Sequence, residues 1–228
     1  CNDEHHGMLS NHQAVAASAL YNAGIISGNN NFIKRSNYFL NKILKKQSNE
    51  GWFEEYGGPD IGYQTHGSFY LAVLWLRSKN NILLESLKLS NEFIKNFIHP
   101  DGSIGGEYAS RDTTFYFPAA YEILSKVDEN ALLIKNHQIK FIEEGLGVGL
   151  RQMDSYNLFP MLNNYIFAHE FGFKKDTKLL MPYEKPGLKV FDQGGLVIKS
   201  TEKYYAIVGV KKGGVIKIWD KKSKKISF

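Results

Sequence analysis

Apolar side chains recur every three or four positions between residues 11 and 171, which is the helical period. Two of the clearest stripes run Phe69, Ala72, Val73, Leu76 and Phe117, Ala120, Tyr121, Leu124. A third stripe runs Leu158, Met161, Leu162, Tyr165. Each helix is expected to bury one face, and the stripe at 135–144 is the weakest. The predicted helices span residues 11–27, 31–46, 65–78, 82–98, 113–126, 135–144 and 157–171.

The pattern changes to short β-branched and aromatic runs after residue 187. Gly194-Gly195, Glu202-Lys203 and Gly213-Gly214 separate these runs, so they predict an antiparallel meander of short strands. Ile226 and Phe228 are expected to start one more strand. The runs are Leu188/Val190, Leu196/Ile198, Tyr204–Val210 and Val215/Ile216/Ile218.

These two patterns divide the chain into a helical part, 1–173, a linker, 174–186, and a β part, 187–228. Pro182 and Pro186 bracket the end of the linker. The predicted sheet ends with an exposed edge, so we expect these strands to open a larger β-domain. The chain begins at Cys1 with no signal-peptide pattern, and we therefore expect a piece of a longer protein whose compartment the sequence does not indicate.

Two glycine-rich loops between the helix pairs resemble each other. Residues 49–57 and 100–109 each run from an acidic-Gly pair through a spacer to Glu-Tyr-small. Gly51 and Gly102 are 51 residues apart, and Glu55 and Glu107 are 52 apart. A period near this length equals two helices with two connections and predicts a helical-hairpin repeat. Such hairpins suit an (α/α) toroid or incomplete barrel whose long loops share one mouth, unless the loops are alike by coincidence.

Composition and charge restrict the classes of function. The single cysteine excludes a disulfide framework and a cysteine-built zinc site, and no apolar run is long enough to span a membrane. Residues 1–173 hold fourteen basic and eighteen acidic residues, whereas residues 174–228 hold fourteen lysines and five acidic residues. A basic end favours an anionic partner. The alternative is that its lysines lie in solvated turns that keep strand edges soluble.

The junction from Tyr56 to Gly67 is the richest candidate for chemistry. It places two tyrosines, an aspartate and a histidine among four glycines, which let a backbone approach a ligand closely. His66 is expected on the first turn of the following helix, where the helix dipole favours a neutral imidazole that can act as a base. The alternative is a helix start with a hydrogen-bonded histidine.

The junction from Gly105 to Thr113 is the counterpart in the second loop. Arg111 is one of few arginines in a lysine-dominated chain and is suited to hold a carboxylate with two hydrogen bonds. The alternative is an ion pair between Arg111 and Asp112 or Glu107. Asp112 itself is typical of a helix N-cap before Thr113.

Three further histidine-containing positions are candidates. His169 shares the predicted buried stripe of its helix, where a lone histidine is more often part of the core. Asn11 and His12 begin the first helix, behind a cap at Ser10 or Asn11, and a toroid mouth could receive them. His5-His6 is a weak metal pair because adjacent residues diverge on a helix, and we predict neither a metal nor a cofactor.

Three segments together resemble the heparinase II/III-like polysaccharide lyases and related alginate-lyase-type proteins. They are Ser10-Asn11-His12, the junction from Trp52 to His66, and Phe191–Leu196 leading into Tyr204–Val210 and Lys212-Gly213-Gly214. The resemblance covers the layout of most of the chain. It implies the late helices of an incomplete (α/α) toroid followed by the opening strands of an antiparallel β-domain.

The resemblance implies β-elimination on an acidic sugar. One group neutralises the uronate carboxylate, a base removes the C5 proton, and an acid protonates the leaving glycosidic oxygen. The candidates are Asn11 or Arg111 for neutralising the carboxylate, His66 or His12 for the base, and Tyr63 or Tyr56 for the acid. The candidates for substrate binding are Trp52, Tyr56, Glu107, Tyr108 and His169. The expected partner is an acidic polysaccharide or oligosaccharide, with no nucleic acid and no membrane span.

Two other functions stay open at this point. An (α/α)-barrel glycoside hydrolase would use two carboxylates across a sugar. These would come from Glu55, Asp60, Glu107 and Asp112. A non-catalytic glycan-binding or assembly protein would use aromatic side chains as stacking surfaces. These would be Trp52, Tyr56, Tyr63 and Tyr108.

Overall fold

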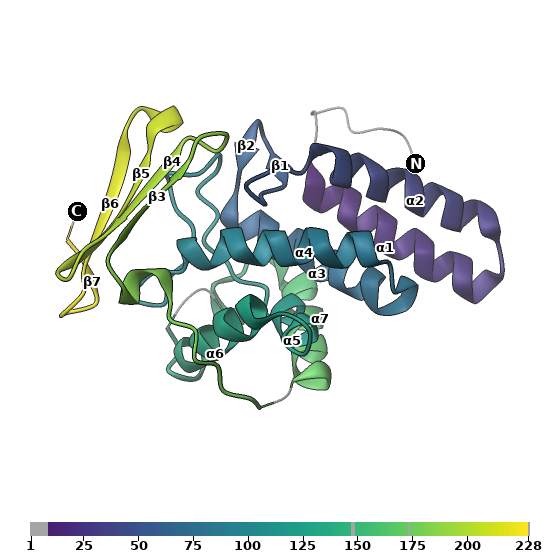
Figure 1. The fold of residues 1–228 in the computed structure, drawn as a ribbon. Helices are drawn as coiled ribbons and strands as arrows, with labels where there is room; N and C mark the ends of the chain where they lie inside the picture. The colour runs from purple at the N-terminus through teal and green to yellow at the C-terminus, as the bar shows by residue number, and fades with distance from the viewer. Residues whose placement is uncertain (1–8, 147–148, 173, 228) are drawn as a thin grey trace.

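The computed structural model describes residues 9–146, 149–172 and 174–227 as an α+β protein with a helical part and an antiparallel sheet (Figure 1). The helices are α1 (Ser10–Ser27), α2 (Asn30–Lys46), α3 (Ile61–Ser78), α4 (Asn81–Ile94), α5 (Ala119–Leu124), α6 (Glu129–Glu143) and α7 (Ser155–Phe171). The strands are β1 (Glu54–Glu55), β2 (Gly58–Pro59), β3 (Gly187–Phe191), β4 (Leu196–Ser200), β5 (Tyr204–Gly209), β6 (Val215–Asp220) and β7 (Lys225–Ile226). None of the helices in these ranges is long and apolar enough to cross a membrane.

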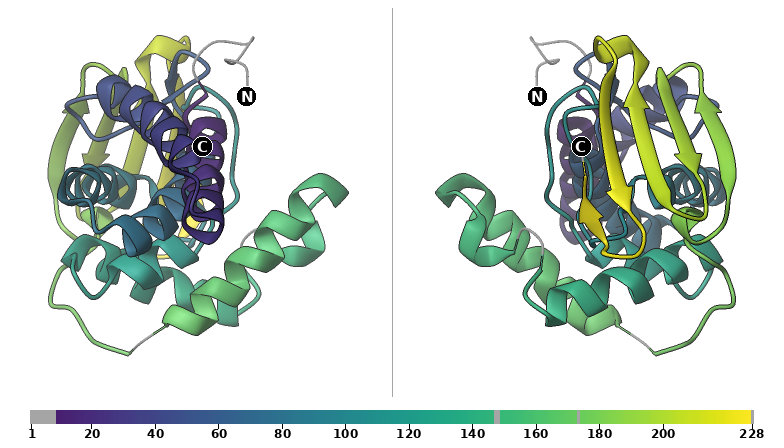
Figure 2. Two further views of the ribbon diagram at one scale, coloured as in Figure 1. Left: turned by 90° about the vertical axis from the view of Figure 1, so that its right-hand side faces the viewer. Right: turned by 90° about the vertical axis from the view of Figure 1, so that its left-hand side faces the viewer.

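The helices pack as successive pairs. Helix α1 packs against α2 and α3, α3 packs against α4 and α5, and α5 packs against α6 and α7. The helices α1, α3, α5 and α7 therefore form one row, and α2, α4 and α6 return alongside it. The row stays open and does not close into a barrel (Figures 1 and 2). The predicted pairing of helices is confirmed.

One predicted helix, 113–126, is wrong over its first half. Only Ala119–Leu124 is helical, and residues 113–118 run without helix. Pro118 disfavours a helical conformation at the residue before it, and the amide of Phe117 donates instead to the Thr65 hydroxyl at 3.2 Å. Because no helix begins at Thr113, the predicted N-cap role of Asp112 is wrong as well.

Helix α7 differs from its predicted packing. Met161 and Asn164 are its buried residues, and the Asn164 side chain accepts a hydrogen bond from the amide of Ala119 at 2.8 Å. Leu158 and Leu162, which were expected in the core, are exposed. Figure 2 shows why: α7 extends away from the rest of the row, so only part of its apolar stripe meets α5.

The sheet is the predicted meander, with strand order β3-β4-β5-β6-β7 and every pair antiparallel. Phe228, the other residue expected in the last strand, lies outside the described residues. One face of the sheet packs on the end of α4 and on the loop after it. The Phe191 ring contacts Phe93 and Phe97, and the Tyr205 hydroxyl donates to the carbonyl of Asn96 at 2.6 Å.

The segment predicted as a linker is fixed to both parts. Met181 is buried, and the Tyr183 hydroxyl shares a hydrogen bond of 2.7 Å with Nε2 of His137 on α6. The Ser200 hydroxyl of β4 donates to the carbonyl of Tyr183. The helical part and the sheet are thus connected by packing and hydrogen bonds as well as by the chain.

Candidate functional site

The two glycine-rich loops meet at the N-terminal end of α3. The amide of Ser110 donates to the carbonyl of Pro59 at 2.8 Å, and the amide of Arg111 donates to Oδ2 of Asp60 at 3.2 Å. Strands β1 and β2 form a short hairpin beside this contact. The predicted proximity of the two loops is confirmed, and it brings Tyr56, Tyr63 and Arg111 to one place.

Asp60 is the buried carboxyl group that joins the loops. It is the N-cap of α3, where Oδ1 accepts the amide of Tyr63 at 2.9 Å while Oδ2 accepts Arg111. Burial raises the pKa of Asp60 to about 6, against the hydrogen bonds from Tyr63, Thr113 and Arg111, which lower it. Because these donors occupy both oxygens, Asp60 positions its neighbours and does not face solvent.

Arg111 and Tyr56 form the exposed part of this region. The guanidinium carbon of Arg111 lies 4.4 Å from the centroid of the Tyr56 ring, in cation–π geometry. Tyr56 is 42% exposed and has a positive φ of 54°, and the centroid of its ring lies 6.1 Å from that of Tyr63. Burial, followed by the neighbouring Tyr56, raises the pKa of Tyr63, so its phenol keeps its proton at neutral pH.

An aromatic row continues inward from Tyr63. The Tyr63 ring meets Phe115 at 5.7 Å, Phe115 meets Phe117 at 5.3 Å, and Phe117 stacks on His66 at 4.4 Å. The assignment of residues 113–118 to a helix hid this contribution of Phe115 and Phe117. The row connects His66 to the exposed end of the site through rings alone.

His66 lies in the second turn of α3, because the helix begins at Ile61 and not at Thr65. The predicted dipole argument for its neutral form is therefore wrong, and burial replaces it as the cause. Burial first, and then the charge of nearby His12, lower the pKa of His66 to about 4. Its Nε2 atom is buried and accepts no hydrogen bond from the described residues.

Asn11 and His12 approach the same place from α1. The amide of Asn11 donates to Oε1 of Glu55 at 2.6 Å, and its Nδ2 donates to Oε2 at 2.8 Å. The N-cap of α1 is Leu9, because the Ser10 hydroxyl donates to a carbonyl of β1 and does not cap the helix. His12 is exposed, and its neighbour Asn11 lies against α3 beside His66, since a Cβ atom on Gly67 would lie 3.3 Å from Cα of Asn11.

Tyr108 lies outside this group, contrary to its predicted role in substrate binding. It is almost fully buried, and its hydroxyl bonds Nε2 of His99 at 2.8 Å. His99 Nδ1 bonds the Ser103 hydroxyl at 2.7 Å, and Ser103 donates to Asp101 at 2.6 Å. The Trp219 ring of β6 stacks on His99 at 4.0 Å. This network fixes the sheet to the second loop.

Of the other predicted binding residues, Trp52 and Glu107 are engaged elsewhere, and His169 lies on a different surface. Trp52 Nε1 donates to Glu50, whose carboxylate accepts two amides of the turn between β3 and β4. Glu107 forms an ion pair with Lys217 of β6, so the alternative partner proposed for Arg111 is taken. His169 is exposed on α7, not buried on its stripe. His5-His6 lies outside the described residues.

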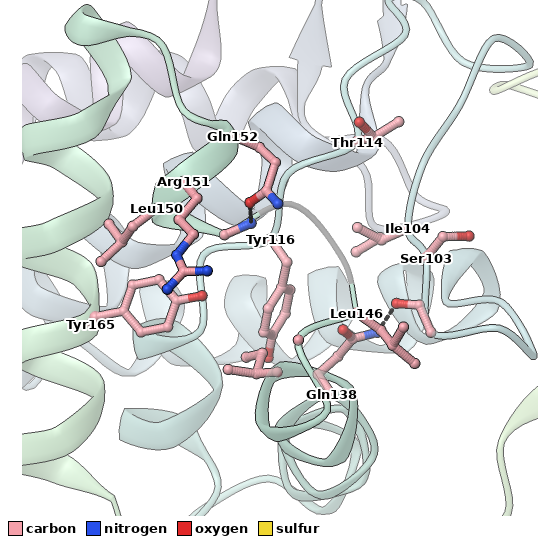
Figure 3. Close-up of a pocket in the computed structure, with 14 residues that line it drawn as sticks. Ser103, Ile104, Thr114, Tyr116, Gln138, Leu146, Leu150, Arg151, Gln152 and Tyr165 are labelled. Carbon is pink, nitrogen blue, oxygen red and sulfur yellow. Dashed lines mark hydrogen bonds between the residues drawn. The ribbon is translucent and has the colours of Figure 1, made fainter.

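A separate cavity of about 550 Å³ lies behind the segment 113–118 (Figure 3). Thr114 and Tyr116 line it, whereas Phe115 and Phe117 contact Tyr63 and His66 on the other side. The segment is therefore a partition whose alternate side chains face the cavity and the candidate site.

The sheet brings a lysine to the edge of the site. Nζ of Lys212, in the connection between β5 and β6, donates to the carbonyl of Ser110 at 2.9 Å, next to Arg111. Across the described ranges no three His, Cys, Asp or Glu side chains cluster as a metal site would require. Comparison of the chain with family models, with curated proteins and with solved structures finds no match.

Proposed function

We propose that the chain is part of an incomplete (α/α) toroid that binds an acidic glycan at the N-terminal ends of α1 and α3 and cleaves it by β-elimination. The row of helices α1, α3, α5 and α7, with α2, α4 and α6 beside it, supports the toroid. The observation that carries the function is the exposed pair of Arg111 and Tyr56 against Tyr63, with the first turn of α1, which carries His12, bonded through Asn11 to Glu55.

The residues divide the reaction between them by exposure and protonation. Arg111 neutralises the sugar carboxylate, which makes the C5 proton more acidic. His12 removes that proton because it is exposed, whereas His66 stacks on Phe117 and its Nε2 atom is buried. Tyr63, which holds its proton at neutral pH, gives it to the glycosidic oxygen. The C5–H and C4–O bonds break, a C4=C5 double bond forms, and no other reactant is needed.

A glycoside hydrolase is less well supported. Its two carboxylates must reach the sugar, yet Glu55 and Asp60 are fully buried with their oxygens occupied by N–H donors. Glu107 is paired with Lys217. A purely glycan-binding protein fits the exposed Arg111 and Tyr56 as well as a lyase does, and turnover separates the two.

The test is to incubate the chain with a polyuronate and with a glycosaminoglycan. A lyase produces an unsaturated sugar that absorbs in the ultraviolet. Tyr63→Phe and His12→Ala should each lower kcat about 100-fold or more, the contribution of a positioned acid or base. Tyr204→Phe, which removes the hydroxyl of an exposed tyrosine on β5, is the control and should keep the wild-type rate.

Salt dependence tests the charge of the partner. Binding should weaken as ionic strength rises, because Arg111 and Lys212 are exposed and salt screens such charges over about 10 Å at 0.1 M. Cleavage to saturated reducing ends would assign a hydrolase, and binding without cleavage would assign a binding protein. Absence of both binding and cleavage would reject the proposal.

A further inference from the structure

Glu55 is a fully buried carboxyl group that the proposed reaction does not use. It lies on β1 and reaches the first turn of α1, far away in sequence. Its two oxygens accept the backbone amide of Asn11 at 2.6 Å and the Asn11 side-chain amide at 2.8 Å. Both donors belong to one residue, so the contact fixes the position of α1 and also the rotation of the Asn11 side chain.

Burial of a charge in such a place is costly. It raises the pKa of Glu55 to about 8, and the nearby carboxylate of Asp60 adds to the effect, while the two hydrogen bonds from Asn11 oppose it. A hairpin could be anchored to a helix at less cost by a neutral side chain. The two N–H donors, one at each oxygen, match the ionised carboxylate that Glu55 becomes above this pKa, whereas an amide accepts at one oxygen only, so Glu55 and an amide are to be compared above pH 8.

The residues that follow Asn11 and Glu55 in sequence are His12 and Tyr56. His12 is exposed one residue beyond the clamped Asn11, and Tyr56 is exposed one residue beyond Glu55. The carboxyl group therefore holds together the two backbones that carry them. Two weaker contacts lie beside it: a backbone bridge pairs Leu9 with Glu55, and the Ser10 hydroxyl donates to the carbonyl of the preceding strand residue.

We infer that Glu55 is a positioning residue that fixes the Asn11 amide and sets His12 against Tyr56 and Tyr63. The inference rests on the proposed function, in which His12 and Tyr63 move the two protons. Glu55 contacts neither the glycan nor a reacting atom. Its effect on the reaction passes through Asn11 and through the separation of α1 from the β1–β2 hairpin.

Glu55→Gln tests the inference with almost no change in shape. The new amide has one acceptor, which the backbone amide of Asn11 takes, so its N–H group faces the Asn11 side chain and forces that amide to turn over. We expect kcat to fall about tenfold or more, with KM within about twofold of wild type, because a small misplacement of reacting groups lowers the rate. Glu92→Gln is the matched control, since it removes a carboxylate that pairs with Lys95 and Lys189 away from the site.

A second readout does not depend on catalysis. In nitrogen-15 NMR spectra the Asn11 side-chain protons, identified by their loss in Asn11→Asp, should shift upfield in Glu55→Gln as the bond to a carboxylate is lost. An unchanged Asn11 signal would overturn the inference. If the wild-type chain is active and Glu55→Gln keeps the wild-type kcat, the inference is also overturned, whereas the proposed function stands. A wild-type chain without lyase activity would reject the proposed function, and the Asn11 signal would still decide whether Glu55 holds the amide.

Discussion

Gly62 lies where α3 touches the second loop, and its replacement by alanine tests how tightly the two are packed. A Cβ atom at this position would lie 2.4 Å from Cγ2 of Thr113, 2.9 Å from its Cβ and 2.8 Å from its carbonyl oxygen. The Thr113 side chain can rotate to move its Cγ2 atom away, but its carbonyl oxygen can move only with the backbone. A Cβ atom on Gly105 would lie only 2.3 Å from the same oxygen, which shows that this oxygen is confined from a second side.

The expected magnitude is a balance of two terms. Alanine in a helix is better than glycine by about 1 kcal/mol. Overpacking of a tight contact costs about 1–3 kcal/mol, and the upper end applies where backbone must move. Gly62→Ala should therefore lower the free energy of unfolding by about 2 kcal/mol. The displaced loop carries Arg111, so glycan binding should weaken as well.

Denaturant unfolding measures this change, and α3 offers its own control. At Gly67 the nearest atom to an added Cβ would be Cα of Asn11 at 3.3 Å, which small adjustments can relieve, so Gly67→Ala should change stability by less than about 1 kcal/mol. Thr113→Ser added to Gly62→Ala removes Cγ2 but keeps the carbonyl, and should recover only part of the loss. A Gly62→Ala protein at least as stable as wild type would refute the packing argument.

Two further predictions concern buried polar groups. Folding raises the pKa of Asp60 from 3.8 to about 6, so the folded state keeps a proton that the unfolded state releases between these pH values. Relative to Asp60→Asn, the free energy of unfolding of the wild type should therefore fall by up to about 3 kcal/mol between pH 3.8 and pH 6. A difference in unfolding free energy between the two proteins that stays constant with pH would contradict this. Tyr108→Phe removes the hydroxyl bonded to His99 Nε2 and leaves that nitrogen buried without its partner. In denaturant titrations the free energy of unfolding should therefore fall by about 1–3 kcal/mol. Tyr204→Phe, at an exposed position, should leave it unchanged.

The sequence predicts the helix pairs and the meander well because both follow from local periodicity. It fails at residues 113–118, where apolar spacing suited to a helix coincides with an extended run before Pro118. The apolar residues of this stretch in fact belong to two different structures, the helix α5 and the aromatic row of Phe115 and Phe117 that reaches Tyr63. A period of apolar residues reports which side chains avoid water, and it does not distinguish one buried surface from another.

The candidate site was predictable where the two loops repeat each other. The likeness of the Tyr56 and Arg111 junctions placed both at one end of the helices, and they do lie together. How deeply each of these side chains is buried was not predictable. Tyr108 occupies the same place in its loop as Tyr56 does in the first, yet it is buried, because the second loop packs on β5 and β6 whereas the first contacts the turn between β3 and β4.

The partition formed by residues 113–118 has a consequence for how this region can evolve. Its side chains alternate between the cavity and the aromatic row, so a deletion of one residue would exchange the two sets and place Thr114 and Tyr116 where Phe115 and Phe117 now lie. Substitutions change one surface at a time, whereas a change in length changes both at once. Among relatives of this chain we therefore expect the number of residues between Thr113 and Pro118 to be kept even where their identities drift.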